Sequence, residues 1–317
     1  MTSIMTNGGA ISAVETLRSI FSTRLTTQQQ LATGLRVGTA EDNTAYWSIA
    51  TTMKSDNKAL SAAEDSLNLG AAAVGIAYTG MTNAIWVTQQ IKDKLINARE
   101  AGVDKNKINS ELTELRDELY SITDAAQFNG VNWLDRTSAA DDQDHQVVGS
   151  FSRDEAGNVS VKLLTYSMTN AMGTNHLIDE DSQGGILTNA AYAAAEGAST
   201  DWVIINGRNQ ALHTEFKLDD NTPPGQVDEM IGVTEQMLMA MTDAAAGLGS
   251  LNARIKMQTD FVANLQDTQD RGVGRLVDAD MNEESTKLKA LQTQQQLGIQ
   301  ALSIANSNSE NILQLFR

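Results

Sequence analysis

The chain has 317 residues, a formal net charge of −17, no cysteine and only two prolines, Pro223 and Pro224. A surface this acidic repels phosphate backbones, which argues against nucleic-acid binding, and the sequence has no run of about 18 apolar residues that could span a membrane. The N-terminus has no basic residue before Arg18 and no apolar core, so we expect no cleavable secretory signal.

Near the N-terminus, apolar residues recur every three or four positions, which places them on one face of an amphipathic helix. A proline inside a helix costs about 3 kcal/mol, and none occurs before Pro223, so this helix and those that follow can be long. The apolar face consists of Val14, Leu17, Phe21, Leu25, Leu31 and Leu35.

A longer pattern runs from Tyr46 to Ala98, where the residue at every third or fourth position is nonpolar, except for Asp56 and Thr88. Such spacing, held over this length, predicts a coiled-coil seam. At 1.5 Å per residue the helix would be roughly 80 Å long.

A second helix is predicted after a break at Gly102. Its apolar positions run from Ile108 to Ala126 at the same spacing, and we expect it to end at Gly130.

Between about 138 and 222 the pattern changes to short stretches in which alternate residues are apolar, at 159–165 and 212–218. Such alternation is typical of strands with one buried face. Gly-Asn and Asn-Gly pairs lie beside these stretches, at 157–158 and 206–207, so two β-hairpins are predicted.

This middle segment also contains a short predicted helix at 190–196. It has four basic residues and thirteen acidic ones, so about half of the net charge of −17 lies here. Because charged side chains are rarely buried, we expect this acidic insert to face solvent.

The two prolines precede a third long stripe, from Val227 to Leu265. Proline is tolerated at the first position of a helix, so the helix is predicted to start there. Gly272 and Gly274 interrupt the pattern, and we expect the helix to end near residue 270.

A final amphipathic helix is predicted from Leu288 to Phe316. It also carries apolar residues off its main stripe, and a helix that is apolar on more than one face must be covered on more than one side. A lone terminal helix cannot achieve this within one molecule, so we expect neighbouring molecules to cover the terminal helices. The candidate contact residues are Val14, Leu17, Phe21, Leu25, Leu31, Leu291, Leu297, Leu302, Ile304, Ile312, Leu315 and Phe316.

Segments far apart in the sequence must pair to cover these seams. We therefore predict a mainly α fold, a long antiparallel helical coiled-coil bundle built from both chain ends, with a small β-rich insert in the middle.

Four short motifs resemble those of bacterial flagellins. Residues 33–37 (T-G-L-R-V) resemble the family's S-G-L-R-[IV], and residues 127–130 resemble its Q-F-N-G element. Residues 279–285 (A-D-M-N-E-E-S) are similar to its A-D-x-x-x-E-[ST] element, and the final L-Q-L-F-R, 313–317, resembles its L-x-L-L-R ending.

The resemblance covers roughly residues 1–135 and 225–317. Residues 46–53 and 277–307 look like the alphaproteobacterial, rhizobial-type branch of the family. The resemblance implies a non-enzymatic structural subunit that self-assembles into the helical filament of the bacterial flagellum.

The family's nested architecture implies three parts. Residues 1–45 with 271–317 would form an inner terminal helical domain, residues 46–137 with 223–270 a surrounding shell of long helices, and residues 138–222 the outer insert. The connectors between the inner domain and the shell would contain Gly34, Leu35 and Arg36 on one side and Gly272 and Gly274 on the other.

The resemblance also implies the partners. These are further copies of the chain, paralogous flagellins, a flagellar export chaperone, and junction and cap proteins. It implies secretion through the flagellar type III apparatus to an extracellular filament, with no cofactor, no nucleic acid and no membrane insertion.

Many flagellins are sensed by a Toll-like receptor through an L-Q-R-V-R-E-L stretch. The corresponding residues here are 89–95, where Ile91 stands at the first arginine and Lys94 at the glutamate, and only Gln90 and Leu95 are retained. Replacing arginine by isoleucine removes its forked hydrogen bonding, so we expect weak or absent sensing.

Metal and catalytic motifs find no support in this sequence. Residues 278–282 (D-A-D-M-N) fit the start of an EF-hand loop, but Glu283 replaces the required glycine and Lys289 the required glutamate. A helix cap at Asp280 is expected instead. The histidines form no H-E-x-x-H pair; they are His145, His176 and His213.

Two other functions stay open. The flagellar hook-filament junction protein shares flagellin-like ends, and a helical signalling scaffold like the cytoplasmic hairpin of chemoreceptors is also rich in glutamine and poor in proline. The closeness of both ends to flagellin favours the filament subunit over the junction protein, and the predicted β insert argues against the scaffold.

Overall fold

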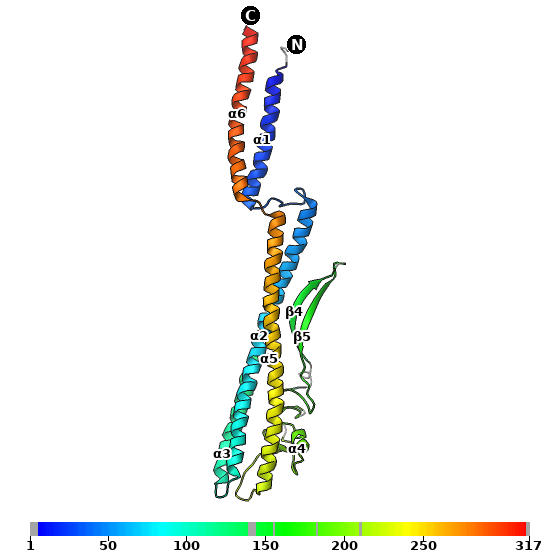
Figure 1. The fold of residues 1–317 in the computed structure, drawn as a ribbon, viewed down its shortest axis with the longest axis vertical. Helices are drawn as coiled ribbons and strands as arrows, with labels where there is room; N and C mark the ends of the chain where they lie inside the picture. The colour runs from blue at the N-terminus through cyan, green and yellow to red at the C-terminus, as the bar shows by residue number, and fades with distance from the viewer. Residues whose placement is uncertain (1–5, 139–143, 155, 182, 209–210, 315–317) are drawn as a thin grey trace. The chain divides into compact units, whose positions relative to one another are not determined.

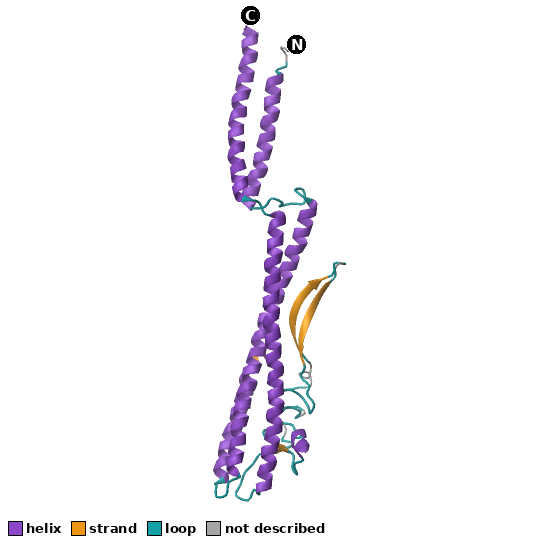
Figure 2. Cartoon of the chain, viewed as in Figure 1, coloured by secondary structure: helices purple, strands orange, loops and turns teal. Residues whose placement is uncertain are grey.

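The computed structural model describes residues 6–138, 144–154, 156–181, 183–208 and 211–314, with side chains as far as residue 307. The chain divides into two compact units, Met1–Lys58 with Leu265–Arg317 and Ala59–Asn264. The elements in chain order are α1 (Gly8–Thr33), α2 (Thr44–Ala98), α3 (Lys105–Ala125), β1 (Gln127–Phe128), β2 (Val131–Asn132), β3 (Asp135–Arg136), β4 (His145–Arg153), β5 (Val159–Tyr166), β6 (Ile178–Asp179), α4 (Ala191–Glu196), β7 (Trp202–Val203), β8 (Thr214–Glu215), α5 (Pro224–Val277) and α6 (Met281–Gln314) (Figures 1 and 2).

The predicted mainly α fold is confirmed, because long helices flank a middle segment that holds the strands (Figure 2). In the second unit α2, α3 and α5 run side by side (Figure 1). The predicted seams face inward there, and even the polar Thr88 is fully buried. Their buried side chains include Leu60, Leu67, Met81, Ile91 and Leu95 of α2, Leu112 and Leu119 of α3, and Val227, Met230, Met237, Met241 and Ile255 of α5.

The first positions of the predicted α2 seam are not buried. Tyr46 and Ile49 are 42% and 50% exposed, whereas Ala50 is 2% exposed and packs with Val273 and Val277. An α-helix has 3.6 residues per turn and drifts about 20° per heptad against a 3.5-residue repeat. The contact face of α2 therefore moves off the predicted stripe near its start.

The prediction that Gly272 and Gly274 end the third long helix is wrong. The helix α5 passes through both glycines to Val277. Each glycine costs the helix about 1 kcal/mol relative to alanine, but Val273 and Val277 of the same turns are 6% and 1% exposed. Burying a valine stabilises by about 1.5–3 kcal/mol, which offsets the glycines.

The prediction that α3 extends to Gly130 is also wrong. The helix ends at Ala125, and residues 127–132 form a tight antiparallel hairpin of β1 and β2. Its two turn residues, Asn129 and Gly130, have φ angles of 50° and 83°. Positive φ at both central residues is what a type I′ hairpin turn requires, and Asn-Gly is the preferred pair for it.

One of the two predicted hairpins forms. Strands β4 and β5 pair antiparallel from His145 opposite Tyr166 to Arg153 opposite Val159. The second prediction is wrong, because β7 and β8 pair parallel. Asn206 makes no two-residue turn; its side chain bonds both the N–H and the carbonyl of His213 across a wider loop.

Two arginines bind the insert to the segments before it, one to β3 and one to α3. The guanidinium Nη1 of Arg136 donates to Asp179 Oδ1 at 2.8 Å, and both side chains are buried. Arg208 contacts Asp124 of α3 and donates to Glu180 Oε1 at 3.0 Å. Its guanidinium also lies 5.1 Å from the ring centroid of Tyr120, a side chain whose pKa burial raises to about 12.

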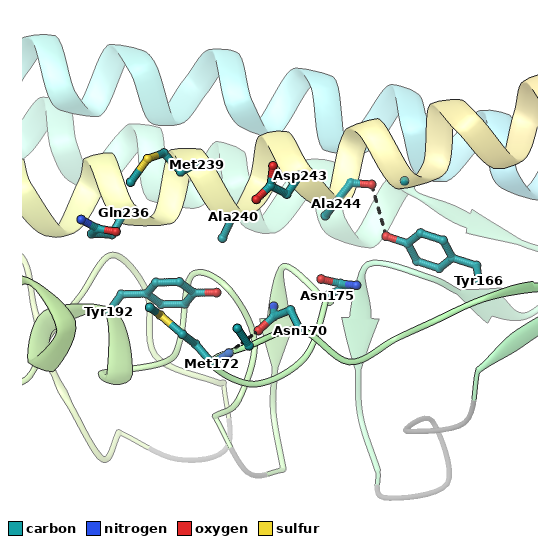
Figure 3. Close-up of a pocket in the computed structure, with 12 residues that line it drawn as sticks. Tyr166, Asn170, Met172, Asn175, Tyr192, Gln236, Met239, Ala240, Asp243 and Ala244 are labelled. Atoms are coloured by element: carbon teal, nitrogen blue, oxygen red, sulfur yellow. Dashed lines mark hydrogen bonds between the residues drawn. The ribbon is translucent and has the colours of Figure 1, made fainter.

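The insert also packs against α5 (Figure 3). The Tyr166 hydroxyl donates to the Ala244 carbonyl at 3.2 Å, and burial raises the pKa of this tyrosine to about 12. Beside this contact lies a cavity of about 440 Å³, with Met239 on the α5 side and Met172 and Tyr192 on the insert side (Figure 3).

Replacing Gly70 or Gly75 of α2 by alanine should change the free energy of unfolding in opposite directions. A Cβ at Gly70 would lie 2.2 Å from Val147 Cγ1, whereas one at Gly75 would meet nothing within 4 Å. Overpacking should make Gly70→Ala less stable by about 1–3 kcal/mol, and Gly75→Ala should be more stable by up to about 1 kcal/mol. Urea unfolding of the purified chain measures both, and equal changes would contradict the packing described.

Candidate subunit interface

The terminal helices α1 and α6 form an antiparallel pair in the first unit (Figure 1). Near one end, Asn7 Nδ2 donates to the Ala305 carbonyl at 2.9 Å. Further along, Arg24 Nη1 donates to Gln295 Oε1 at 2.6 Å. Residues from opposite ends of the chain therefore fix the register of the two helices.

Local capping explains where the two helices begin and end. Asn7 Oδ1 accepts from the N–H of Ala10 at 3.0 Å, and Gly34 ends α1 with a φ of 72°. Asp280 Oδ1 accepts from the N–H of Glu283 at 3.3 Å at the start of α6. The expectation of a helix cap at Asp280 is confirmed.

Some of the predicted contact residues turn toward the partner helix within the pair. Leu291 is buried, and the half-buried members are Val14, Leu17, Leu31 and Leu302. Leu315 and Phe316 lie outside the described residues, and so does the side chain of Ile312.

The other predicted contact residues lie on the surface of the pair. Phe21 and Leu25 are 47% and 45% exposed, and Leu297 and Ile304 are 58% and 63% exposed. Sequence reasoning missed Ile11 and Ile299, which are 60% and 55% exposed. Ile11 lies three residues before Val14, so the spacing of three or four residues that predicted the stripe could also have identified Ile11.

This surface is unusual for a helix that faces water. Between Lys289 and Glu310 of α6 no residue is charged. The cores of protein interfaces are depleted of charge, and burying a leucine, isoleucine or phenylalanine stabilises by about 1.5–3 kcal/mol each. The pair therefore presents apolar surface that a neighbouring molecule can cover with a net gain.

The first predicted connector contacts the segment between α5 and α6. The N–H of Ala279 donates to the Gly34 carbonyl at 2.9 Å, and Leu35 forms an antiparallel bridge with Asp278. The guanidinium Nη2 of Arg36 donates to the Leu276 carbonyl at 3.2 Å. A cation placed on the last carbonyls of a helix stabilises that helix end.

The second connector is shorter than the resemblance implied. Gly272 and Gly274 belong to α5, so only residues 278–280 separate α5 from α6. In the first connector, Asp42 Oδ2 accepts from the N–H groups of Thr39 and Gly38, both at 2.9 Å. These hydrogen bonds, Thr39 first, hold the pKa of Asp42 below its usual value and fix the turn before α2.

Comparison with known proteins identifies the family. Residues 4–139 match the bacterial flagellin N-terminal helical region, and residues 231–316 match the bacterial flagellin C-terminal helical region. Flagellin C of Rhizobium meliloti (strain 1021) is 50% identical over 324 residues that cover all of both chains. Flagellin A of the same strain is 42% identical over 394 residues, and the flagellin of Brucella melitensis biotype 1 is 38% identical over 319, again over all of both chains.

The chain belongs to the bacterial flagellin family. As a flagellin it is a structural subunit of the extracellular flagellar filament, assembles with other flagellin subunits and is not an enzyme. The relatives from Rhizobium confirm the resemblance to the rhizobial-type branch. No helix in the described part of this flagellin is both long and apolar enough to cross a membrane.

The stretch compared with the receptor motif lies on α2 of this flagellin. Ile91 and Leu95 are 1% and 0% exposed in the α2 seam, whereas Gln90 and Lys94 reach the surface. Lys94 Nζ also pairs with Glu111 Oε2 of α3 at 2.5 Å. Ile91 therefore does not occupy the place of a solvent-exposed arginine.

Moving the receptor motif back by one residue, so that it aligns with residues 88–94, agrees better with the burial of Ile91. Ile91 then stands at the valine of the motif, and Lys92 and Asp93 stand at its second arginine and its glutamate. Gln90 takes the place of the first arginine. The expectation of weak sensing stays a prediction, and it now depends on Gln90.

Gly298 offers a direct test of the helix pair. A Cβ at this position would lie 2.8 Å from Leu17 Cδ2, whereas one at Gly8 would meet nothing within 4 Å. Gly298→Leu should force α1 and α6 apart and raise the critical concentration for assembly at least about tenfold, the equivalent of about 1.4 kcal/mol. Gly8→Leu is the matched control; seeded assembly followed by light scattering compares the two, and equal critical concentrations would contradict the pairing.

Proposed function

We propose that this flagellin polymerises through the exposed apolar faces of α1 and α6. The observation that carries the proposal is the exposure of Phe21, Leu25, Leu297 and Ile304, each near or above one half, on helices that already pair with each other. Apolar side chains that stay exposed on both helices of one pair need a further partner. In a homopolymer that partner is the same surface region of neighbouring subunits.

The nested architecture of the family would place this interface in the innermost part of the filament. We propose that residues 1–45 with 271–317 form the inner terminal domain, that residues 46–137 with 223–270 form the shell, and that residues 138–222 face outward. The acidic balance of the insert supports an outer position, because exposed charges remain hydrated there. Covering the inner helices would couple their ordering to assembly.

The finer partners are also proposals. Export of this flagellin would require an unfolded chain, an export chaperone and passage through the flagellar type III apparatus. Junction and cap proteins would contact the two ends of the filament. The apolar terminal helices support a chaperone contact before assembly, because free surfaces of this kind associate non-specifically.

Charge placed in the proposed interface should block assembly. Leu297→Asp puts a carboxylate where contact with a neighbour would desolvate it, and a buried unpaired charge is strongly unfavourable. We expect a folded monomer whose critical concentration rises at least about tenfold. The matched control is Leu212→Asp in the insert, since Leu297 and Leu212 are 58% and 65% exposed.

Electron microscopy after seeding provides the measurement, with circular dichroism to check folding. Truncation of residues 1–35 should give the same loss as Leu297→Asp. Filaments of normal length from either variant would overturn the proposed interface.

Receptor sensing gives a separate prediction. Purified monomer should activate a flagellin-sensing Toll-like receptor weakly, because Gln90 lacks the guanidinium fork of arginine. Gln90→Arg should raise the response in a reporter-cell assay, while Gln89→Arg serves as a control one position away. Strong activation by the unmodified monomer would show the prediction to be wrong.

A further inference from the structure

The chain contains three asparagines that are directly followed by glycine: Asn7, Asn129 and Asn206. Asparagine is among the thermolabile residues, and this dipeptide is the most prone to spontaneous deamidation, because glycine has no Cβ to hinder the approach of its backbone nitrogen to the asparagine side chain. The three steps share the same local chemistry, so their surroundings in the folded chain decide which of them reacts.

The reaction begins when the backbone nitrogen of the glycine, having lost its proton to hydroxide, attacks the side-chain carbonyl carbon Cγ of the asparagine. A bond forms between these two atoms, the Cγ–Nδ2 bond breaks, and ammonia leaves. Water then opens the resulting five-membered succinimide at either carbonyl, which gives aspartate or isoaspartate. The asparagine side chain must therefore be free to turn, and the glycine nitrogen must be able to reach Cγ.

Asn206 is not free to make this movement in the folded chain. It is 6% exposed, its Nδ2 donates to the His213 carbonyl at 2.9 Å, and its Oδ1 accepts from the N–H of the same residue at 3.1 Å. The backbone of Gly207 is also confined, since a Cβ there would lie 2.9 Å from the Asp179 carbonyl oxygen. Attack on Asn206 would require both side-chain hydrogen bonds to break inside a packed loop.

Asn7 is held in a similar way by its role as the cap of α1. Its Oδ1 accepts from the N–H of Ala10 at 3.0 Å, and its Nδ2 donates to the Ala305 carbonyl of α6 at 2.9 Å. Both polar atoms of this side chain are therefore engaged. Turning it toward Gly8 would uncap α1 and release the contact with α6.

Asn129 has neither kind of restraint. Asn129 and Gly130 are both exposed at the tip of the β1–β2 hairpin, and the Asn129 side chain makes no hydrogen bond to any part of the chain that the structure describes. A Cβ at Gly130 would meet nothing within 4 Å. The hairpin has only two residue pairs, between residues 127–128 and 131–132, and short exposed elements of this kind open at little cost in free energy.

The base of the hairpin stays in place when its tip opens. Asn132 Nδ2 donates to the Thr123 carbonyl at 2.7 Å, and Asn132 Oδ1 accepts from the N–H of Leu134 at 2.9 Å. These hydrogen bonds anchor the second strand to the end of α3. The tip can therefore open repeatedly, and expose the Asn129–Gly130 step, while the rest of the chain remains folded.

We propose that Asn129 is a deamidation site of the folded chain, and that it converts to aspartate and isoaspartate while Asn7 and Asn206 stay intact. The reaction needs no neighbouring subunit, so this proposal stands apart from the interface proposed for the terminal helices. Each conversion adds a negative charge, and isoaspartate also lengthens the backbone by a carbon atom. The longer backbone does not fit the two-residue turn that sets the register of β1 and β2.

The three sites can be compared within one sample. The purified full chain is incubated at mildly alkaline pH, and peptide mapping by mass spectrometry follows the change of each asparagine from an amide to a carboxylic acid. Asn129 should convert at least about tenfold faster than Asn7 and Asn206, because the two restrained sites react only in the small fraction of molecules in which they are open. The matched control is the same chain in concentrated urea, where the three rates should agree within about threefold because the native contacts are lost.

Equal rates at Asn129 and Asn206 in the folded chain would overturn the proposal. So would an Asn129 that converts in urea but stays intact in buffer. A preference for Asn129 that persists undiminished in urea would also overturn it, because the flanking sequence, and not the fold, would then select the site.

The Asn129→Asp variant separates the added charge from the lengthened backbone. It carries the aspartate product, and because aspartate also fits a type I′ turn before Gly130, its hairpin should keep its hydrogen-exchange protection. A sample enriched in isoaspartate at position 129 should exchange the amide hydrogens of residues 127–132 faster than this variant and the unmodified chain. Equal exchange in all three samples would contradict the predicted loss of the turn.

Discussion

Pairing between opposite ends of the sequence is the interaction on which this structure depends. Asn7 bonds to Ala305, and Leu35 pairs with Asp278. In the second unit, Lys92 of α2 pairs with Glu235 of α5 at 2.5 Å beside the buried seams. Each of these helices carries an apolar stripe that must be covered. The stripes of the N-terminal half are covered by helices of the C-terminal half, so neither half can bury its apolar surface without the other.

This constraint also explains why the middle of the chain is free to differ. The family models match residues 4–139 and 231–316 and leave most of the insert unmatched. The alignment with Flagellin A spans 394 positions, more than the 317 residues of this chain, so that relative has residues without a counterpart here. An insert between two paired helical halves can change in length without disturbing the seams.

Charge is distributed unevenly along the chain, in a way that suits repeated self-association. The insert carries about half of the net charge, whereas residues 66–91 of α2 and the stretch of α6 between Lys289 and Glu310 carry none. Subunits with the same charge must place it away from their contacts. Charge that remains on the insert is hydrated and favours solubility of the assembled polymer.

The sequence by itself determined the helices, because the spacing of apolar residues is a local property. Apolar residues three or four positions apart lie on one face of a helix that has 3.6 residues per turn. The sequence also determined the β4–β5 hairpin, the cap at Asp280 and the apolar character of Leu297 and Ile304. Tertiary structure alone decided that α5 continues through Gly272 and Gly274, because the burial of Val273 and Val277 outweighs the cost of two glycines. It also decided that Trp202 pairs parallel with Thr214 and that Arg136 of β3 meets Asp179 of the insert, since both contacts join residues whose proximity no local pattern specifies.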